Sequence, residues 1–287
     1  MTDSPSTRQR TLFVHTGGIG DFLLACPALT ALARGESVDL LGRPERLKLA
    51  VEAGVARAAY SLDAADFDSA FHTPSERLKA FLAPYNRAVV WIRDDTGTLA
   101  ANLRACGVAR VDAFPGLPPD DWERSAAEYY AERLGFTDLP PFRLNLASLT
   151  PPGDVLIHPG SGSARKNWPF DRFRAVAQDL QDRGHAVAWC AGPAELERGV
   201  APPGRPVLED SLVTLARRLA GARLYLGNDS GVTHLAAAAG CPTVALFGPT
   251  NPAAWAPRGS NVHVLQGAPW PTTPDVRDLL RRLLEQV

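Results

Sequence analysis

The chain has 287 residues, of which 45% are hydrophobic and 21% are charged, and its formal net charge is -1. This length and composition predict a globular protein of about two domains. The balanced charge argues against a bulk electrostatic partner such as nucleic acid. No run of about twenty apolar residues occurs, so the sequence predicts no transmembrane helix. The polar residues 1–10 are not expected to be a signal peptide.

The cysteines are widely separated and form no C-x-x-C pair; they are Cys26, Cys106, Cys190 and Cys241. This pattern argues against a zinc site and against a disulfide framework. A reducing, cytoplasmic setting fits it best.

Short apolar runs alternate with longer amphipathic stretches along the chain. Strands are expected at 12–15, 38–41, 88–92, 155–158, 186–189, 223–226 and 243–247. Helices are expected at 21–33, 77–83, 125–134, 170–183, 212–220 and 232–239. Continuous apolar strands alternating with helices indicate parallel sheets covered on both faces.

The alternating pattern predicts two α/β domains. The first covers residues 1–145, and the Pro-rich stretch that contains Pro140, Pro141, Pro151 and Pro152 is typical of a linker. The second covers residues 150–270. The last segment, 271–287, is expected to contain a helix that packs back on the first domain.

The first candidate functional segment follows a strand and opens a helix, with the sequence Val14-His15-Thr16-Gly17-Gly18-Ile19-Gly20-Asp21. Its three glycines permit close backbone approach, and a helix start offers free N–H groups to an anion or polar ligand. Asp21 is equally well explained as a functional carboxylate and as a first-turn acid that stabilises the helix. The segment is not the dinucleotide fingerprint, because Leu23 stands where that motif needs glycine.

The second segment, residues 158–169, also follows a strand and reads HPGSGSARKNWP. Its small residues, with Arg165 and Lys166, make a plausible cradle for an anion. It is not a Walker A loop, because Arg165 stands where the glycine before the lysine is required. The alternative interpretation is a surface loop with solvated cations, although the bulk of Trp168 favours packing.

The third segment, residues 227–234, reads GNDSGVTH and again joins a strand to a helix. Asp229 or Ser230 suits a helix cap, and Gly231 permits close approach to a phosphate. His234 lies one turn into the helix, where the alternative interpretation is a core histidine. A serine nucleophile is disfavoured, because Val232 stands where the nucleophile elbow needs its second glycine.

All three segments lie at carboxyl ends of strands, the edge at which open α/β sheets bind ligands. Two domains that face each other across a cleft would place the first segment on one wall and the other two on the opposite wall.

In this order and spacing, the segments resemble glycosyltransferase family nine, the ADP-heptose:lipopolysaccharide heptosyltransferases. The resemblance runs from Gly17 to about Pro252 and is most specific over residues 228–235, NDSGVTHL, and 247–252, FGPTNP. It implies two Rossmann-like domains with the active site between them, the GT-B arrangement. It also implies inverting, metal-independent transfer of a sugar such as heptose from a nucleotide-diphosphate donor, ADP-linked in this family, to a glycan or glycolipid acceptor such as lipopolysaccharide core. A lipid-linked acceptor implies peripheral contact with the inner membrane.

The resemblance also implies roles for particular residues. Asp21 looks like the general base on the acceptor hydroxyl, and Lys166 like the cation that neutralises the donor diphosphate. The glycines of the first segment would form the acceptor-side loop. The donor pocket would contain Ser161, Ser163, Asp229, Ser230, Gly231 and His234. Glu195, which follows Ala191-Gly192-Pro193, would contact the nucleotide ribose.

Asp66-Phe67-Asp68 has the D-x-D spelling of a metal-dependent glycosyltransferase, but it lies in a polar, Ala- and Asp-rich segment. We interpret it as a solvated loop and expect neither a metal nor a cofactor. Two alternative functions stay open. A sugar-nucleotide epimerase would need several acid–base groups around the sugar, and a non-catalytic sugar-nucleotide-binding protein would be indifferent to Asp21→Asn.

Overall fold

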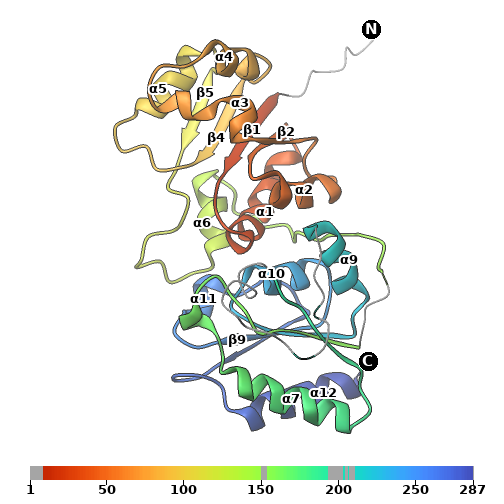
Figure 1. The fold of residues 1–287 in the computed structure, drawn as a ribbon. Helices are drawn as coiled ribbons and strands as arrows, with labels where there is room; N and C mark the ends of the chain where they lie inside the picture. The colour runs from red at the N-terminus through yellow and green to blue at the C-terminus, as the bar shows by residue number, and fades with distance from the viewer. Residues whose placement is uncertain (1–8, 150–153, 193–202, 204–205, 207–210, 287) are drawn as a thin grey trace. The chain divides into compact units, whose positions relative to one another are not determined.

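The computed structural model describes residues 9–149, 154–192, 203, 206 and 211–286. The chain divides into two compact units (Figure 1). The first comprises residues 1–17, 25–121 and 127–140, and the second comprises 18–24, 122–126 and 141–287. Each unit contains one five-stranded parallel sheet, so the expected α/β class is confirmed.

The first sheet has the strand order β3-β2-β1-β4-β5. Its strands are β1 (Arg10–His15), β2 (Ser37–Gly42), β3 (Ala59–Ser61), β4 (Arg87–Trp91) and β5 (Arg110–Ala113). The central strand β1 pairs Phe13 with Leu40 on one side and with Val89 on the other. This is the Rossmann order 3-2-1-4-5 without a sixth strand. The strand order reverses between β1 and β4, the position at which such sheets bind ligands beyond the carboxyl ends of their strands.

Helices cover the first sheet on both faces. They are α1 (Ile19–Ala33), α2 (Pro44–Glu52), α3 (Leu62–Ala65), the 3-10 helix η1 (Phe67–Phe71), α4 (Glu76–Leu82), α5 (Thr98–Ala105) and α6 (Ala126–Arg133). Leu12 and Val14 point to one face and pack in a core with Phe67, Leu78 and Leu99. On the other face, Trp91 packs against Phe13, Phe114, Tyr129 and Tyr130.

The second sheet has the strand order β10-β9-β8-β6-β7. Its strands are β6 (Val155–His158), β7 (Val187–Trp189), β8 (Leu224–Asn228), β9 (Thr243–Phe247) and β10 (Val262–Gln266). All neighbours are parallel. Counted from β6, this is the doubly wound 2-1-3-4-5 order, whose reversal lies between β6 and β8.

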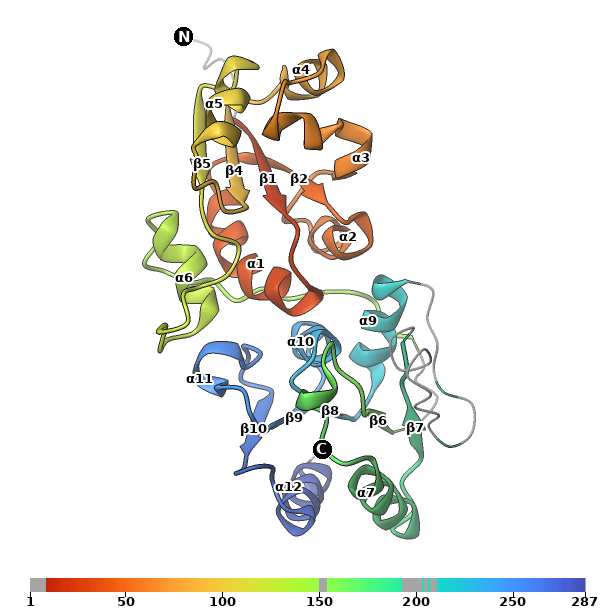
Figure 2. The ribbon, with the colours of Figure 1, turned by 60° about the vertical axis from the view of Figure 1, so that its left-hand side comes forward.

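The helices of the second unit are the 3-10 helix η2 (Ala164–Lys166), α7 (Phe170–Asp182), α9 (Leu212–Gly221), α10 (Gly231–Ala238), α11 (Pro252–Trp255) and α12 (Thr273–Glu285). Figures 1 and 2 show α7 and α12 on one face of the sheet and α9 and α10 on the other. Val276, Leu280 and Leu284 of α12 belong to the same core as Val155 and Phe173. The apolar face of this last helix therefore completes the second core. The expectation that the helix also packs back on the first domain stays a prediction.

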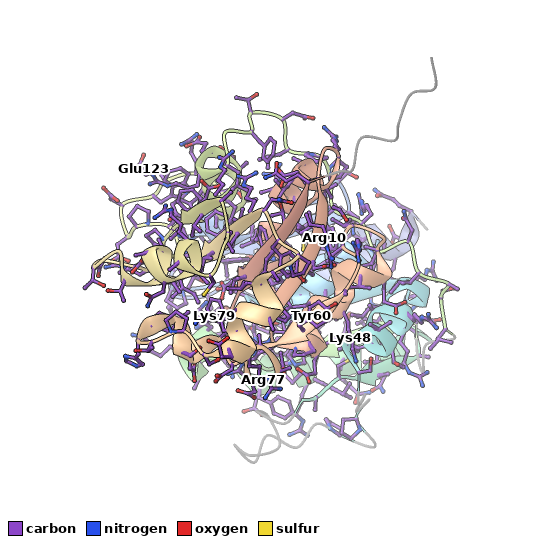
Figure 3. The ribbon with its side chains drawn as sticks, turned by 90° about the horizontal axis from the view of Figure 1, so that it is seen from above. Arg10, Lys48, Tyr60, Arg77, Lys79 and Glu123 are labelled. Atoms are coloured by element: carbon purple, nitrogen blue, oxygen red, sulfur yellow. The ribbon has the colours of Figure 1, made fainter. Side chains whose placement is uncertain are left out.

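A network of charged residues closes the amino edge of the first sheet. The Asp39 carboxylate, 1% exposed, accepts from an Arg10 guanidinium nitrogen at 2.9 Å and from the Tyr85 hydroxyl at 3.0 Å. Arg87, at the start of β4, pairs with Glu36 at 2.6 Å and Asp112 at 2.7 Å. Figure 3 labels Arg10 at the start of β1. Buried charges paired in this way avoid the cost of isolated ones.

The Asp66-Phe67-Asp68 segment is not the expected solvated loop. Asp66 ends α3 with φ 52°, in the left-handed region, and the chain turns directly into η1. Phe67 is 1% exposed and anchors the turn in the core. None of the described helices is long and apolar enough to cross a membrane.

Candidate functional site

The loops that leave β6, β8 and β9 meet at the carboxyl edge of the second sheet. These strands are neighbours, so the residues that follow them are brought together although they are far apart in sequence. The loop after β6 contributes Lys166, the turn after β8 contributes Asp229, and the segment after β9 contributes Thr250. This edge also holds the reversal of strand order, the usual ligand-binding position in such sheets.

The Asp229 carboxylate is the centre of this cluster. Its Oδ2 accepts a hydrogen bond from Lys166 Nζ at 2.8 Å and another from Thr250 Oγ1 at 2.9 Å. Asp229 is 7% exposed, whereas the Lys166 side chain is 36% exposed. The backbone N–H of Asp229 donates to the Leu246 carbonyl at 3.0 Å, which fixes its main chain to β9. The lysine can therefore turn toward a ligand more readily than the carboxylate can.

Asn228, the last residue of β8, holds the preceding loop in place. Its amide oxygen accepts from the Trp168 backbone N–H at 2.9 Å, and its amide nitrogen donates to the Pro159 carbonyl at 2.7 Å. Trp168 is 1% exposed, and its indole N–H donates to the Pro271 carbonyl at 3.0 Å. The two ends of the loop that carries Lys166 are thus tied to β8, so this loop is not a free surface loop.

Ser161 and Ser163, both expected in the donor pocket, lie in this loop. The Ser161 hydroxyl donates to the Ser163 carbonyl and also contacts Asn167 Oδ1, each at 2.7 Å. Ser161 is 3% exposed. Its hydroxyl therefore shapes the turn in which the η2 segment with Lys166 begins.

The N-terminus of α10 lies directly after Asp229. Ser230 is its N-cap, and the serine hydroxyl accepts from the Thr233 N–H at 3.4 Å and contacts Thr233 Oγ1 at 3.0 Å. Of the two expected caps, the structure selects Ser230. The helix then starts at Gly231, which has no side chain to cover the first N–H groups. Such a terminus favours negative charge.

His234 lies one turn into α10 and is 6% exposed. Burial lowers the pKa of its imidazole to about 4, against smaller opposing effects of nearby carboxylates. The side chain is therefore neutral at physiological pH and adds no positive charge to the cluster.

The segment after β9 is held by close packing. A Cβ at Gly248 would lie 2.7 Å from the Pro269 carbonyl oxygen and 2.8 Å from the Trp270 ring, so glycine is required there. Asn251 caps α11 by accepting from the Ala253 N–H at 2.9 Å. Thr250 lies between these two constraints. Thr250 lies within the segment that resembles the family but was not expected to be a site residue. No local signal distinguishes it, because its contact with Asp229 depends on β9 lying beside β8.

The first candidate segment forms the start of α1. Phe22 N–H donates to the Gly18 carbonyl at 3.0 Å, so Gly18 occupies the N-cap position. Asp21, three residues later, accepts from the Gly18 N–H through Oδ2 at 2.8 Å. This is the reciprocal bond of a capping box. Asp21 therefore does stabilise the helix start, and it uses only one of its carboxylate oxygens to do so.

Two side chains support this turn at the carboxyl end of β1. Arg46, in α2, donates to the Gly17 carbonyl and fixes the turn before Gly18 and Gly20, which was expected to form the acceptor-side loop. His15, 3% exposed, has a pKa lowered to about 3, first by burial and then by the Arg46 charge. The turn therefore lies beside a neutral imidazole and one guanidinium.

The remaining candidates take no part in these clusters. Glu195 lies outside the described residues. Cys26, Cys190 and Cys241 are buried and Cys106 is half-buried, and none of the four forms a disulfide. In the part of the chain that the structure describes, no group of three or more His, Cys, Asp and Glu side chains is arranged to hold a metal ion.

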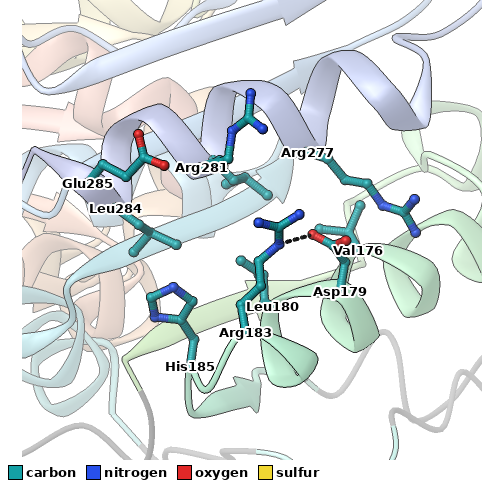
Figure 4. Close-up of a pocket in the computed structure, with 10 residues that line it drawn as sticks. Val176, Asp179, Leu180, Arg183, His185, Arg277, Arg281, Leu284 and Glu285 are labelled. Carbon is teal, nitrogen blue, oxygen red and sulfur yellow. Dashed lines mark hydrogen bonds and ion pairs between the residues drawn. The ribbon is translucent and has the colours of Figure 1, made fainter.

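A separate cavity of about 190 Å³ lies between α7 and α12 (Figure 4). Its floor is apolar, with Val176, Leu180 and Leu284, and its rim carries the Arg183–Asp179 ion pair at 3.0 Å. It lies on the face of the sheet opposite α10. The cavity is therefore not part of the cluster around Asp229.

Comparison with known proteins points to one family. The model of glycosyltransferase family 9 (heptosyltransferase) matches residues 98–281. Over 128 aligned residues the chain is 38% identical to lipopolysaccharide heptosyltransferase 1 of Pseudomonas aeruginosa. The aligned region covers 42% of this chain and 35% of that protein. The match thus spans about a third of the length of that relative.

Two solved structures are similar in fold. E. coli ADP-heptose LPS heptosyltransferase II has a TM-score of 0.78 at 18% identity, with 97% of this chain and 99% of that chain covered. TibC of enterotoxigenic E. coli, an iron-containing dodecameric glycosyltransferase, has a TM-score of 0.61 at 18% identity, with coverage of 92% and 64%. These likenesses confirm the expected GT-B fold class with two Rossmann-like domains.

We expect the free energy of unfolding to decrease as the pH falls below about 6.5. His234 and His15 have folded pKa values of about 4 and about 3, whereas an unfolded histidine binds its proton near 6.5. The unfolded state therefore holds more protons in this window, and each residue costs about 1.4 kcal/mol per pH unit as the pH falls.

Urea unfolding between about pH 7 and 5 measures this slope. His234→Gln should reduce it by about one histidine's share, while His72→Gln, at an exposed position, should leave it unchanged. If the pH dependence of the unfolding free energy were the same in His234→Gln as in the wild type, the low folded-state pKa of His234 would be contradicted.

Proposed function

The chain belongs to glycosyltransferase family 9, and on that premise we propose that it transfers heptose from ADP-heptose to a glycan or glycolipid acceptor such as lipopolysaccharide core. The names of the similar proteins supply the sugar and the nucleotide. The observation that carries the proposal is the convergence of Lys166, Asp229 and the start of α10 at the reversal of the second sheet.

The donor diphosphate would bind at this edge. Lys166 supplies a half-exposed ammonium group, and the first N–H groups of α10 supply a partial positive charge. Ser163 and Gly231 would lie beside the phosphates, Ser230 and the neutral His234 would line the pocket, and Glu195 would contact the ribose. Charge developing on the leaving diphosphate would be stabilised by groups already in place, which is the largest contribution in many enzymes.

Asp21 would act as the general base at the start of α1. One carboxylate oxygen is held by the Gly18 N–H, which leaves the other to take the proton of the acceptor hydroxyl. The acceptor oxygen then bonds to the anomeric carbon, and the bond from that carbon to the diphosphate oxygen breaks with its electrons passing to ADP. Attack opposite the leaving group inverts the anomeric centre.

The reaction would need no metal, because Lys166 and the α10 terminus supply the neutralising charge that a divalent cation supplies in metal-dependent transferases. A glycolipid acceptor would bring the protein to the cytoplasmic surface of the inner membrane as a peripheral enzyme.

Lys166→Ala should weaken ADP binding about tenfold or more, because a charge-assisted hydrogen bond contributes about 1.5–3 kcal/mol. Titration calorimetry with ADP measures the dissociation constant directly. Arg165→Ala is the matched control, since Arg165 is the neighbouring exposed cation of the same 3-10 turn. Equal losses in the two variants would show a diffuse charge effect and remove the specific role of Lys166.

Asp21→Asn should lower the rate of transfer about 100-fold or more, the scale of general base catalysis, with ADP-heptose affinity unchanged. Asp275→Asn is the control, because Asp275 occupies the same first-turn position in α12, three residues after its N-cap Thr272. Transfer to a lipopolysaccharide core acceptor is followed by mass spectrometry. Normal turnover in Asp21→Asn would exclude the base role, and product formed without acceptor would indicate an epimerase.

Activity should stay within about twofold after dialysis against EDTA, because no step of the proposed reaction uses a metal. The transfer assay by mass spectrometry, repeated with the dialysed enzyme, measures the remaining activity. Loss of activity that Mg²⁺ or Fe²⁺ restores would contradict the metal-independent mechanism.

A further inference from the structure

Two donors share one acceptor oxygen in the cluster around Asp229. Lys166 Nζ and Thr250 Oγ1 both donate to Asp229 Oδ2, at 2.8 Å and 2.9 Å. Both bonds that the described part of the chain makes to this carboxylate end on Oδ2. Oδ1 is thus left to accept from a ligand.

The two donors differ in what a ligand does to them. Under the proposed function, a diphosphate draws the Lys166 ammonium toward its own oxygens, so the Asp229 carboxylate loses part of its only ion-pair partner in the described residues. The carboxylate then lies beside a second anion, and the like charges repel. The Thr250 hydroxyl is neutral, so the diphosphate has little electrostatic attraction for it.

We propose that Thr250 is a positioning residue that keeps the Asp229 carboxylate in place when Lys166 binds the diphosphate. Asp229 Oδ1 can then accept a hydrogen bond from a hydroxyl of the donor sugar. This inference rests on the proposed function. It makes the Thr250–Asp229 pair the element that distinguishes a nucleotide-diphosphate sugar from the nucleotide diphosphate alone.

The backbone on both sides of Thr250 is suited to this task. Gly248 packs against Pro269 and Trp270 too closely for any side chain, and Asn251 begins α11 with a capping bond. Asp229 is tied to β9 through its own N–H. The hydroxyl and the carboxylate are therefore held by two rigid segments, and their contact does not depend on Lys166.

The test is titration calorimetry of the full chain with two probes, ADP and ADP-heptose. Thr250→Val replaces the hydroxyl by a methyl group and leaves the branching of the side chain unchanged. It should weaken ADP-heptose binding about tenfold and change ADP binding by less than about twofold. Thr250→Ser, which restores a hydroxyl, should recover most of the affinity for ADP-heptose.

Two controls separate positioning from general loosening of the fold. Thr243→Val makes the same change at the other end of β9, where the hydroxyl donates to the Cys241 carbonyl at 2.7 Å; it should leave the preference for ADP-heptose over ADP unchanged. In an Asp229→Ala background, Thr250→Val should have no further effect on ADP-heptose binding, because there is no carboxylate left to hold.

The outcomes are distinct. Equal weakening of ADP and ADP-heptose by Thr250→Val, no weakening of either, or an undiminished effect in the Asp229→Ala background would each overturn the positioning role while leaving the proposed function intact. A wild-type chain that binds neither ADP nor ADP-heptose would overturn the proposed function and this inference together.

Discussion

A single buried amide organises the carboxyl edge of the second sheet. Asn228 has no exposed surface, yet its side chain bonds both the Pro159 carbonyl and the Trp168 N–H, and its own carbonyl accepts from the Thr233 hydroxyl. The loop after β6 and the first turn of α10 are thus both hydrogen-bonded to the last residue of β8. Because unpaired buried amide groups are costly, each of these bonds restricts the loop to one arrangement, and the position of Lys166 follows from it.

Three residues for which a functional role is proposed also have a structural role. Asp21 makes the carboxylate half of a capping box, Ser161 shapes its own turn, and Ser230 caps α10. These bonds fix the direction of the side chains and reduce the reorganisation that ligand binding or reaction requires. A capping or turn role is therefore compatible with a role in the site for these residues.

The sequence predicted the buried strands well and the edges poorly. Expected strands such as 12–15, 155–158 and 243–247 are continuous apolar runs, because both faces of a parallel sheet are covered. The edge strand β7 was expected at 186–189, whereas the edge strands β3, β5 and β10 are short or half-exposed and have no such run. Lys166 and Asp229 were expected in one site from their motifs, but their contact depends on β6 lying beside β8, which no local pattern encodes. Thr250 shows the same limit: a threonine three residues after a strand is unremarkable until strand order places it against Asp229.

The Lys166–Asp229 ion pair also has a consequence for selectivity. The lysine already has a carboxylate counter-ion, so an incoming anion must exchange one ionic contact for another. Chloride or a single carboxylate would gain little by that exchange. An oligophosphate that also reaches the first N–H groups of α10 would keep a net gain. Under the proposed function, Asp229 thus competes with any incoming anion for Lys166, and this competition favours an oligophosphate over the small anions of the surrounding solution.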